Sequence, residues 1–142
     1  MNPLIVLSAL ALFFCCQVDA SHQSVAVHGW LRCKSEYLGN IPIKLWDKDT
    51  VDPDDLMSES VSGQGGPSER LPLGYFNISG TSTEITKIDP ELRVYHSCTE
   101  DGKQVCSKVI IPQSYITDNS AVPSRSYNAE VITLEDKVND CT

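Results

Sequence analysis

The residues of this chain that could do chemistry are its cysteines and histidines, a run of aspartates and one asparagine. Cys15 and Cys16 fall in an apolar N-terminal segment, and an even number of cysteines in the rest of a secreted chain is typical of disulfides. Zinc binding is the rival use, but the chain has no C-x-x-C pair and no metal-type histidine spacing. We therefore expect two disulfides among the four remaining cysteines, Cys33, Cys98, Cys106 and Cys141.

Four cysteines permit three pairings, and a predicted β-hairpin around the polar turn Thr99–Lys103 favours one of them. Antiparallel pairing that sets Cys98 opposite Cys106 also sets Val94 opposite Ile110, so that apolar residues share one face of the hairpin. We therefore expect a Cys98–Cys106 bridge.

That bridge leaves Cys33 to pair with Cys141. The second bridge would tie the first predicted strand to the C-terminal tail. Because it would close a very long loop, the chain-entropy estimate of its stabilisation is about 4–5 kcal/mol.

The segment Asp47–Asp55 places five carboxylates in nine residues. Hard cations such as Ca²⁺ take several carboxylate oxygens, so a weak calcium site is one interpretation. The segment lacks the glycine and the closing glutamate of an EF-hand loop and contains an Asp-Pro break, which favours a solvated interaction loop without a metal. The residues concerned are Asp47, Asp49, Asp52, Asp54 and Asp55.

The other polar candidates point away from catalysis. General acid–base chemistry needs a partner within hydrogen-bond reach, and none of His22, His28 and His96 sits in a recognisable catalytic motif. We expect neither a catalytic site nor a cofactor. Asn77 begins the N-glycosylation sequon Asn-Ile-Ser, which we expect to be a modification site if the chain passes through the secretory route.

Residues 1–20 are predicted to be a secretory signal peptide, cleaved after Ala20, and residues 21–142 to be one domain. The apolar run from Leu4 to Cys16 falls short of the roughly 20 residues that a bilayer span needs, so we expect no transmembrane anchor. We expect the mature protein to be secreted and extracellular. Loss of Asp19 changes the formal net charge from −8 to −7. Such an acidic chain is unsuited to nucleic acid.

Short runs of alternating polarity, separated by turn signals, indicate an all-β fold. Residues 63–74 hold four glycines and two prolines and are predicted to be a flexible loop. The pattern is typical of a β-sandwich of about seven to eight strands, stabilised by disulfides. The predicted strands are residues 24–33, 41–47, 56–62 (a strand or a turn of helix), 75–80, 92–97, 105–111 and 127–134.

Several of these segments together resemble the transthyretin-like family of secreted nematode proteins. The resemblance covers almost the whole mature chain and rests on residues 29–33, 43–47, 54–57, 80, 88–92, 94–98, 106, 111–112 and 127–134. It implies a transthyretin-like sandwich of two antiparallel sheets and an extracellular life. It also implies a shorter turn than residues 63–74 and a glycine where this chain has Glu130.

The same fold hosts hydroxyisourate hydrolase, which requires several histidines, an arginine and a C-terminal Tyr-Arg-Gly-Ser. The tetrapeptide is absent from Val138–Thr142, and His28 would stand alone, so an enzyme ranks third. Transthyretin itself carries small hydrophobic ligands in a channel formed by oligomerisation, which makes a lipophilic carrier the second hypothesis and leaves the oligomeric state open. The favoured hypothesis is a protein that binds an extracellular protein or cell-surface partner, with residues 47–57 and 63–74 as candidate surfaces.

Overall fold

The computed structural model describes residues 19–141. Most of the predicted signal peptide lies outside the described residues, so its cleavage after Ala20 stays a prediction. Within residues 19–141 no helix is both long enough and apolar enough to traverse a bilayer.

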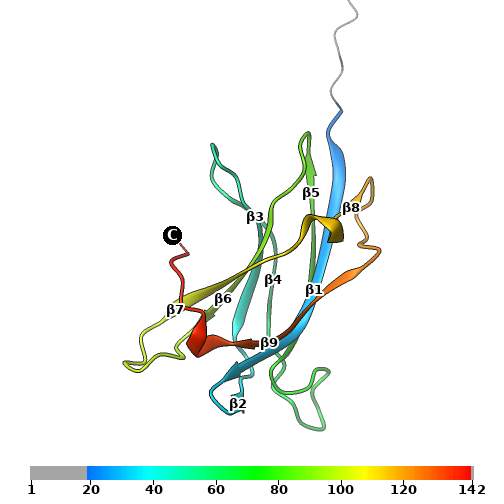
Figure 1. Ribbon diagram of the computed structural model, residues 1–142. Helices are drawn as coiled ribbons and strands as arrows, with labels where there is room; N and C mark the ends of the chain where they lie inside the picture. The colour runs from blue at the N-terminus through cyan, green and yellow to red at the C-terminus, as the bar shows by residue number, and fades with distance from the viewer. Residues whose placement is uncertain (1–18, 142) are drawn as a thin grey trace, which may run out of the picture.

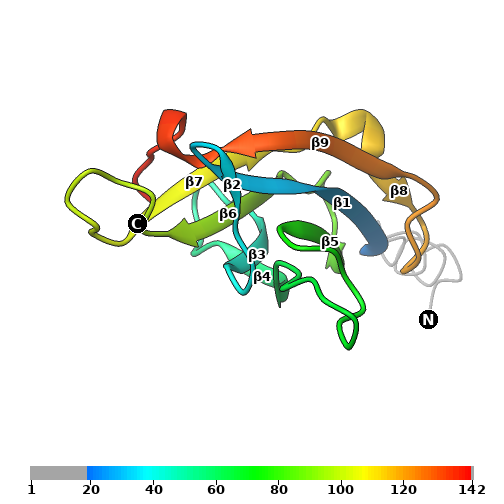
Figure 2. The same cartoon turned by 90° about the horizontal axis from the view of Figure 1, so that it is seen from below.

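Two β-sheets form two layers (Figures 1 and 2). Sheet A has five strands, of which β1 is the central one, and sheet B has the strand order β4-β3-β6-β7. The predicted all-β sandwich is confirmed. Sheet A consists of β1 (Ser21–Cys33), β2 (Glu36–Tyr37), β5 (Tyr75–Glu84), β8 (Thr117–Asp118) and β9 (Ser126–Thr133). Sheet B consists of β3 (Pro42–Asp47), β4 (Asp55–Val61), β6 (Pro90–His96) and β7 (Val105–Ile110), and the 3₁₀ helices are η2 (Gln113–Tyr115) and η3 (Leu134–Asp136).

β1 is the central strand of sheet A. One edge of β1 pairs antiparallel with β5, where Val25 lies opposite Gly80. The other edge pairs with β9 in parallel, where Val27 lies opposite Tyr127, and β2 and β8 pair antiparallel with the two ends of β1. Pairing in the two sheets is therefore antiparallel except between β1 and β9.

The core lies between the sheets and follows the predicted alternation. Val25 and Val27 on β1 are fully buried, as are Ile43 and Leu45 on β3. Removing each such side chain from water stabilises the fold by about 1.5–3 kcal/mol. The other buried apolar residues of this cluster are Leu31, Phe76, Ile78, Ile88, Leu92, Val94, Cys98, Ile111, Ile116, Ile132 and Leu134.

The register of the β6–β7 hairpin differs from the prediction. The last paired residues are His96 and Val105, so the connecting loop is residues 97–104 and Cys98 lies beyond the ladder. Val94 faces Ser107 rather than Ile110, and Ile110 is 76% exposed. The prediction was wrong because it closed the hairpin directly around the polar turn.

The predicted disulfide pairing is also wrong. The structure pairs Cys33 with Cys98 and Cys106 with Cys141. The shifted register explains the difference, because Cys106 lies opposite Tyr95 and contacts the C-terminal tail through a β-bridge to Asn139. Cys98 lies in the loop and is bonded to Cys33, the last residue of β1.

Glu130 takes the bend that the family resemblance assigned to glycine. Its φ of 57° lies in the left-handed region, and its N–H donates to Asn128 Oδ1 at 2.9 Å. The bend falls where the β1–β9 register shifts between His28 and Trp30. A Cβ on Gly29 would come within 2.7 Å of the Glu130 carbonyl oxygen. The close approach of β1 and β9 therefore requires a glycine at position 29 on β1, whereas the bend on β9 forms with glutamate at position 130.

Candidate functional site

The acidic segment lies at the end of the sandwich where β1 begins (Figure 1). There the loop between β3 and β4 contacts the loop between β5 and β6, because the Lys48 N–H donates to the Asp89 carbonyl oxygen at 2.9 Å. We call residues 47–55 and 84–91 together the acidic end. It contains eight acidic residues and two lysines.

Two of the predicted site residues have structural partners. Asp47 is buried, and its Oδ1 accepts the Asp89 N–H at 2.8 Å. Burial raises the Asp47 pKa despite that hydrogen bond. Asp54 accepts the Asp49 N–H at 3.0 Å and a guanidinium N–H of Arg93. The Arg93 hydrogen bond is the main reason that the Asp54 pKa lies below its ordinary value. Both aspartates therefore hold the loops in place.

Arg93 is the residue that fixes the acidic loop to sheet B. Its side chain is 8% exposed, and its Nε donates to Glu91 Oε2 at 2.7 Å. The guanidinium also stacks over Trp46, 4.9 Å from the ring centroid. A planar guanidinium can bind two carboxylates while it stacks on an aromatic ring, which a lysine ammonium group cannot do. Arg93 therefore ties Asp54, at the end of the acidic loop, to β6.

The remaining carboxylates of the segment point outward. Asp52 and Asp55 are exposed and Asp49 is half-buried. Partial burial raises the Asp49 pKa, and the negative charges of Asp55, Asp52 and Asp54 raise it further. Two exposed aliphatic side chains belong to the same end, Val51 at 92% exposure and Ile85 at 66%. The acidic end thus combines unpaired negative charge with apolar tips.

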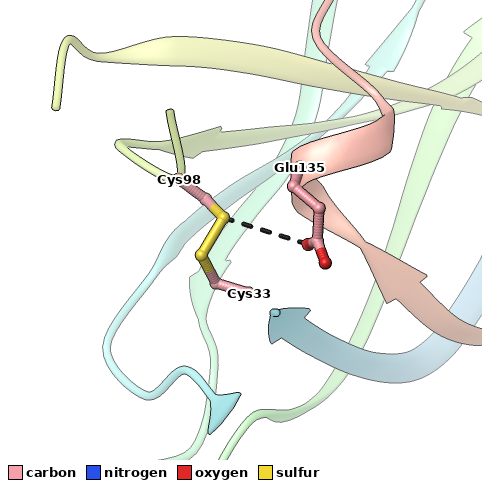
Figure 3. A group of neighbouring side chains, drawn as sticks. All are labelled: Cys33, Cys98 and Glu135. Atoms are coloured by element: carbon pink, nitrogen blue, oxygen red, sulfur yellow. Dashed lines mark hydrogen bonds between the residues drawn. A yellow bond between two sulfur atoms is a disulfide. The ribbon is translucent and has the colours of Figure 1, made fainter. Parts of the chain in front are cut away.

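A calcium site in the acidic segment stays a prediction. In the part of the chain that the structure describes, the group of potential metal ligands within 4.8 Å of one another is Cys33, Cys98 and Glu135, outside the acidic end. Figure 3 shows the two sulfurs joined in a disulfide beside Glu135, whose Oε2 lies 3.9 Å from Cys98 Sγ. A disulfide sulfur has neither a proton to donate nor a thiolate to bind a metal.

The two candidate loops lie at opposite ends of the sandwich. Residues 63–74 form a loop, as predicted, and their flexibility stays a prediction. The Gly63 N–H donates to the Tyr75 carbonyl oxygen at 2.8 Å, at the start of β5. The same end carries a hollow of about 710 Å³, lined by residues including Cys33, Lys34, Glu36 and Glu135. The two loops therefore cannot form one binding surface.

His96 has a structural role beside the Cys33–Cys98 bridge. Its ring is buried, and its Nδ1 accepts the Cys98 N–H at 3.0 Å. Nε2 therefore carries the ring proton and donates it to Ser107 Oγ at 2.8 Å, while the Ser107 hydroxyl donates to the Lys137 carbonyl oxygen. This chain of hydrogen bonds joins the hairpin loop, β7 and the C-terminal tail around a neutral imidazole.

Acidification should weaken the fold through His96. Burial lowers its pKa in the folded state below 6.5, whereas the unfolded chain binds the proton near pH 6.5. Stability is therefore lost as the pH falls from about 6.5 towards the folded pKa, by up to about 1.4 kcal/mol per pH unit. Urea unfolding at pH 7.5 and 5.5 should give a smaller difference for His96→Gln than for the unmodified protein. His28→Gln is the control, and an equal effect of both substitutions would contradict this role.

Sequence reasoning missed a cluster of aromatic rings on the outer face of sheet A. Trp30 contacts Tyr75 and Tyr37 edge to face, with ring centroids 5.1 and 5.5 Å apart. His28 lies 6.5 Å from Tyr75, and its Nδ1 is hydrogen-bonded to Ser126 Oγ at 2.7 Å. The alternation of β1 was a usable signal, because the register that points Val27 inward points Trp30 outward. The contact with Tyr75 required the pairing of β1 with β5.

Asn77 is exposed on this outer face, opposite His28 in the β1–β5 pairing. The histidines do not gather into a site. His22, the second residue of β1, has its Nδ1 3.2 Å from the Thr83 hydroxyl, and His28 and His96 are hydrogen-bonded to different serines. The three histidines therefore lie in separate environments.

A family profile and several relatives match this chain. The profile described as TTR-52, Transthyretin-like family, matches residues 28–112. Transthyretin-like protein 46 of Caenorhabditis elegans is 34% identical over 80% of this chain, which spans 60% of that protein's length. Transthyretin-like proteins 33 and 5 of the same organism are 32% and 37% identical over 88% and 79% of this chain, covering 85% and 76% of their own lengths.

Proposed function

Because the chain belongs to the transthyretin-like family, we propose that it is a secreted binding protein that recognises an extracellular protein partner through its acidic end. The observation that carries the proposal is the fixed presentation of loop 48–54, which Arg93 holds through Asp54. Loops held by a rigid scaffold are the usual carriers of recognition. The predicted leader, residues 1–20, supports the extracellular compartment.

The charge of this end selects the partner's chemistry. Asp49, Asp52 and Asp55 offer carboxylates without a basic side chain bonded to them, so a surface rich in lysine or arginine would be complementary. Complementary charge speeds association and excludes wrong partners more than it adds affinity. We therefore expect binding to weaken as salt rises.

The apolar tips would supply the contact area. Val51 and Ile85 are exposed on the two loops that Lys48 and Asp89 join. Interfaces commonly place apolar residues at the centre and charged residues at the rim. The partner surface is therefore an apolar patch bordered by basic residues.

A carrier of a small lipophilic molecule is the alternative. The hollow of about 710 Å³ has a volume in the range of small-molecule sites. Its lining includes Lys34, Glu36, Glu100 and Glu135, and charged walls do not suit a lipophilic ligand. A protein partner is therefore favoured, and the names of the relatives point to no reaction.

The test is a binding screen of the mature protein against a panel of purified extracellular domains from the source organism. For each partner found, the triple variant Asp49→Asn, Asp52→Asn, Asp55→Asn should raise Kd at least tenfold and flatten its dependence on salt. Val51→Ser should raise Kd without changing the salt dependence.

The control is Glu36→Gln, Glu69→Gln, Glu100→Gln, which makes the same change of charge away from the acidic end. A panel without a partner, or a partner that responds equally to both triple variants, would contradict the proposal. Both variants should retain the melting temperature of the unmodified protein, since the residues are exposed or partly exposed.

A further inference from the structure

The outer face of sheet A presents a second surface whose occupant the chain itself specifies. Asn77, the sequon asparagine, lies on β5 two residues after Tyr75, so that both side chains point to the same side of the sheet. Across the strand pair, Asn77 faces His28 and Tyr75 faces Trp30. The Asn77 side chain therefore lies directly beside the aromatic cluster.

On the other side of Asn77 the same face is hollowed. Ala26 is small and lies between Ser79 on β5 and Ser126 on β9. The resulting hollow of about 330 Å³ is lined by both serines together with Asn77 and Arg125. Hydroxyl groups and a guanidinium are hydrogen-bond partners for the hydroxyl and acetamido groups of a sugar.

We propose that Asn77 carries an N-linked glycan whose first N-acetylglucosamine packs on this face, between the Tyr75 ring and the hollow over Ala26. The proposal rests on the secretory route of the proposed function, but not on the acidic end. A sugar ring laid over an aromatic side chain removes apolar surface of both from water. The glycan would therefore cover part of the Tyr75 ring, which is partly exposed on this face.

The modification is a group transfer with a lipid-linked oligosaccharide diphosphate as the co-reactant. The Asn77 side-chain nitrogen attacks C1 of the first N-acetylglucosamine and forms the C–N bond. The bond between C1 and the diphosphate oxygen breaks, the lipid diphosphate leaves with the electron pair, and the amide nitrogen loses one proton. The backbone of β5 is unchanged, and the exposed position of Asn77 leaves room for the product.

The experiment compares the full chain secreted from a eukaryotic host with its Asn77→Gln and Ser79→Ala variants. Intact mass should show a glycan on the unmodified sequence alone. The glycosylated protein should melt about 3 °C higher than either variant, a shift of the size expected from one added aromatic contact. A secreted protein without the glycan would overturn this inference and leave the acidic-end proposal standing.

A double-mutant cycle tests the packing itself. In the Tyr75→Ala background the difference between glycosylated and Asn77→Gln protein should vanish, whereas Tyr95→Ala, on the other sheet, should preserve it. If Tyr75→Ala fails to fold, enzymatic trimming of the unmodified glycoprotein to one sugar answers the same question. The protein with a single sugar should keep the raised melting temperature. If trimming lowers the melting temperature to that of the Asn77→Gln variant, the packing proposal is wrong.

Discussion

The double substitution Cys33→Ser, Cys98→Ser should lower the free energy of unfolding by about 4 kcal/mol, because the bridge closes a loop whose ends are 65 residues apart. Removal of Cys106–Cys141, with a separation of 35, should cost nearly as much, since loop-closure entropy grows only with the logarithm of length. Urea unfolding of the oxidised proteins measures both effects. Each loss is comparable to a large part of the stability of an ordinary domain.

Counting free thiols separates the observed pairing from the one that the hairpin pattern predicted. In the observed pairing, Cys33→Ser, Cys98→Ser leaves the Cys106–Cys141 bridge intact and no free thiol. Removing Cys98 and Cys106 together would instead break both bridges and expose two thiols. The reverse result, in which the second variant has no free thiol, would show that Cys98 and Cys106 are bonded to each other.

Replacement of Arg93 by methionine should destabilise the protein by about 3–5 kcal/mol, because it leaves the carboxylate of Glu91, 5% exposed, without its counter-ion. The same change frees Asp54 and removes the stacking contact with Trp46. We therefore also expect faster amide hydrogen exchange in loop 48–54. Adding Glu91→Gln should restore part of the lost stability, since the buried charge is then absent.

Lys44→Met is the matched control for Arg93→Met. Lys44 lies opposite Arg93 in the β3–β6 pairing of sheet B. Its ion pair with Glu59 is long, at 4.0 Å, and open to solvent. Exposed pairs contribute about 0–1 kcal/mol. Similar losses for Lys44→Met and Arg93→Met would mean that the Arg93 pairs are as weak as surface ones.

The strands were predictable because each sheet has one buried face. The alternation that buries Ile43 and Leu45 is a property of the sequence, and so is the glycine- and proline-rich composition of loop 63–74. The register of a hairpin depends on which residues form its last pair before the loop. The sequence around Thr99–Lys103 was compatible with more than one such pair. The observed register differs from the predicted one by three residues, and this shift changed every partner of Cys98 and Cys106.

The candidate site was predictable in composition and not in arrangement. The acidic run is visible in the sequence, but its union with residues 84–91 depends on hydrogen bonds of Lys48 and Asp47 with Asp89, where β3 pairs with β6 in sheet B. The role of Arg93 is likewise set by contacts with Asp54, 39 positions away. These contacts depend on which strands pair and in what register, which local patterns do not encode.

The Cys106–Cys141 bridge has a consequence for proteolysis. Most of residues 119–125, which connect β8 to β9, are exposed, so this segment is open to a protease. A single cut there would divide the chain between the two cysteines of the bridge, and the bridge would keep both fragments in one molecule. The nicked protein would therefore separate into two pieces only after reduction.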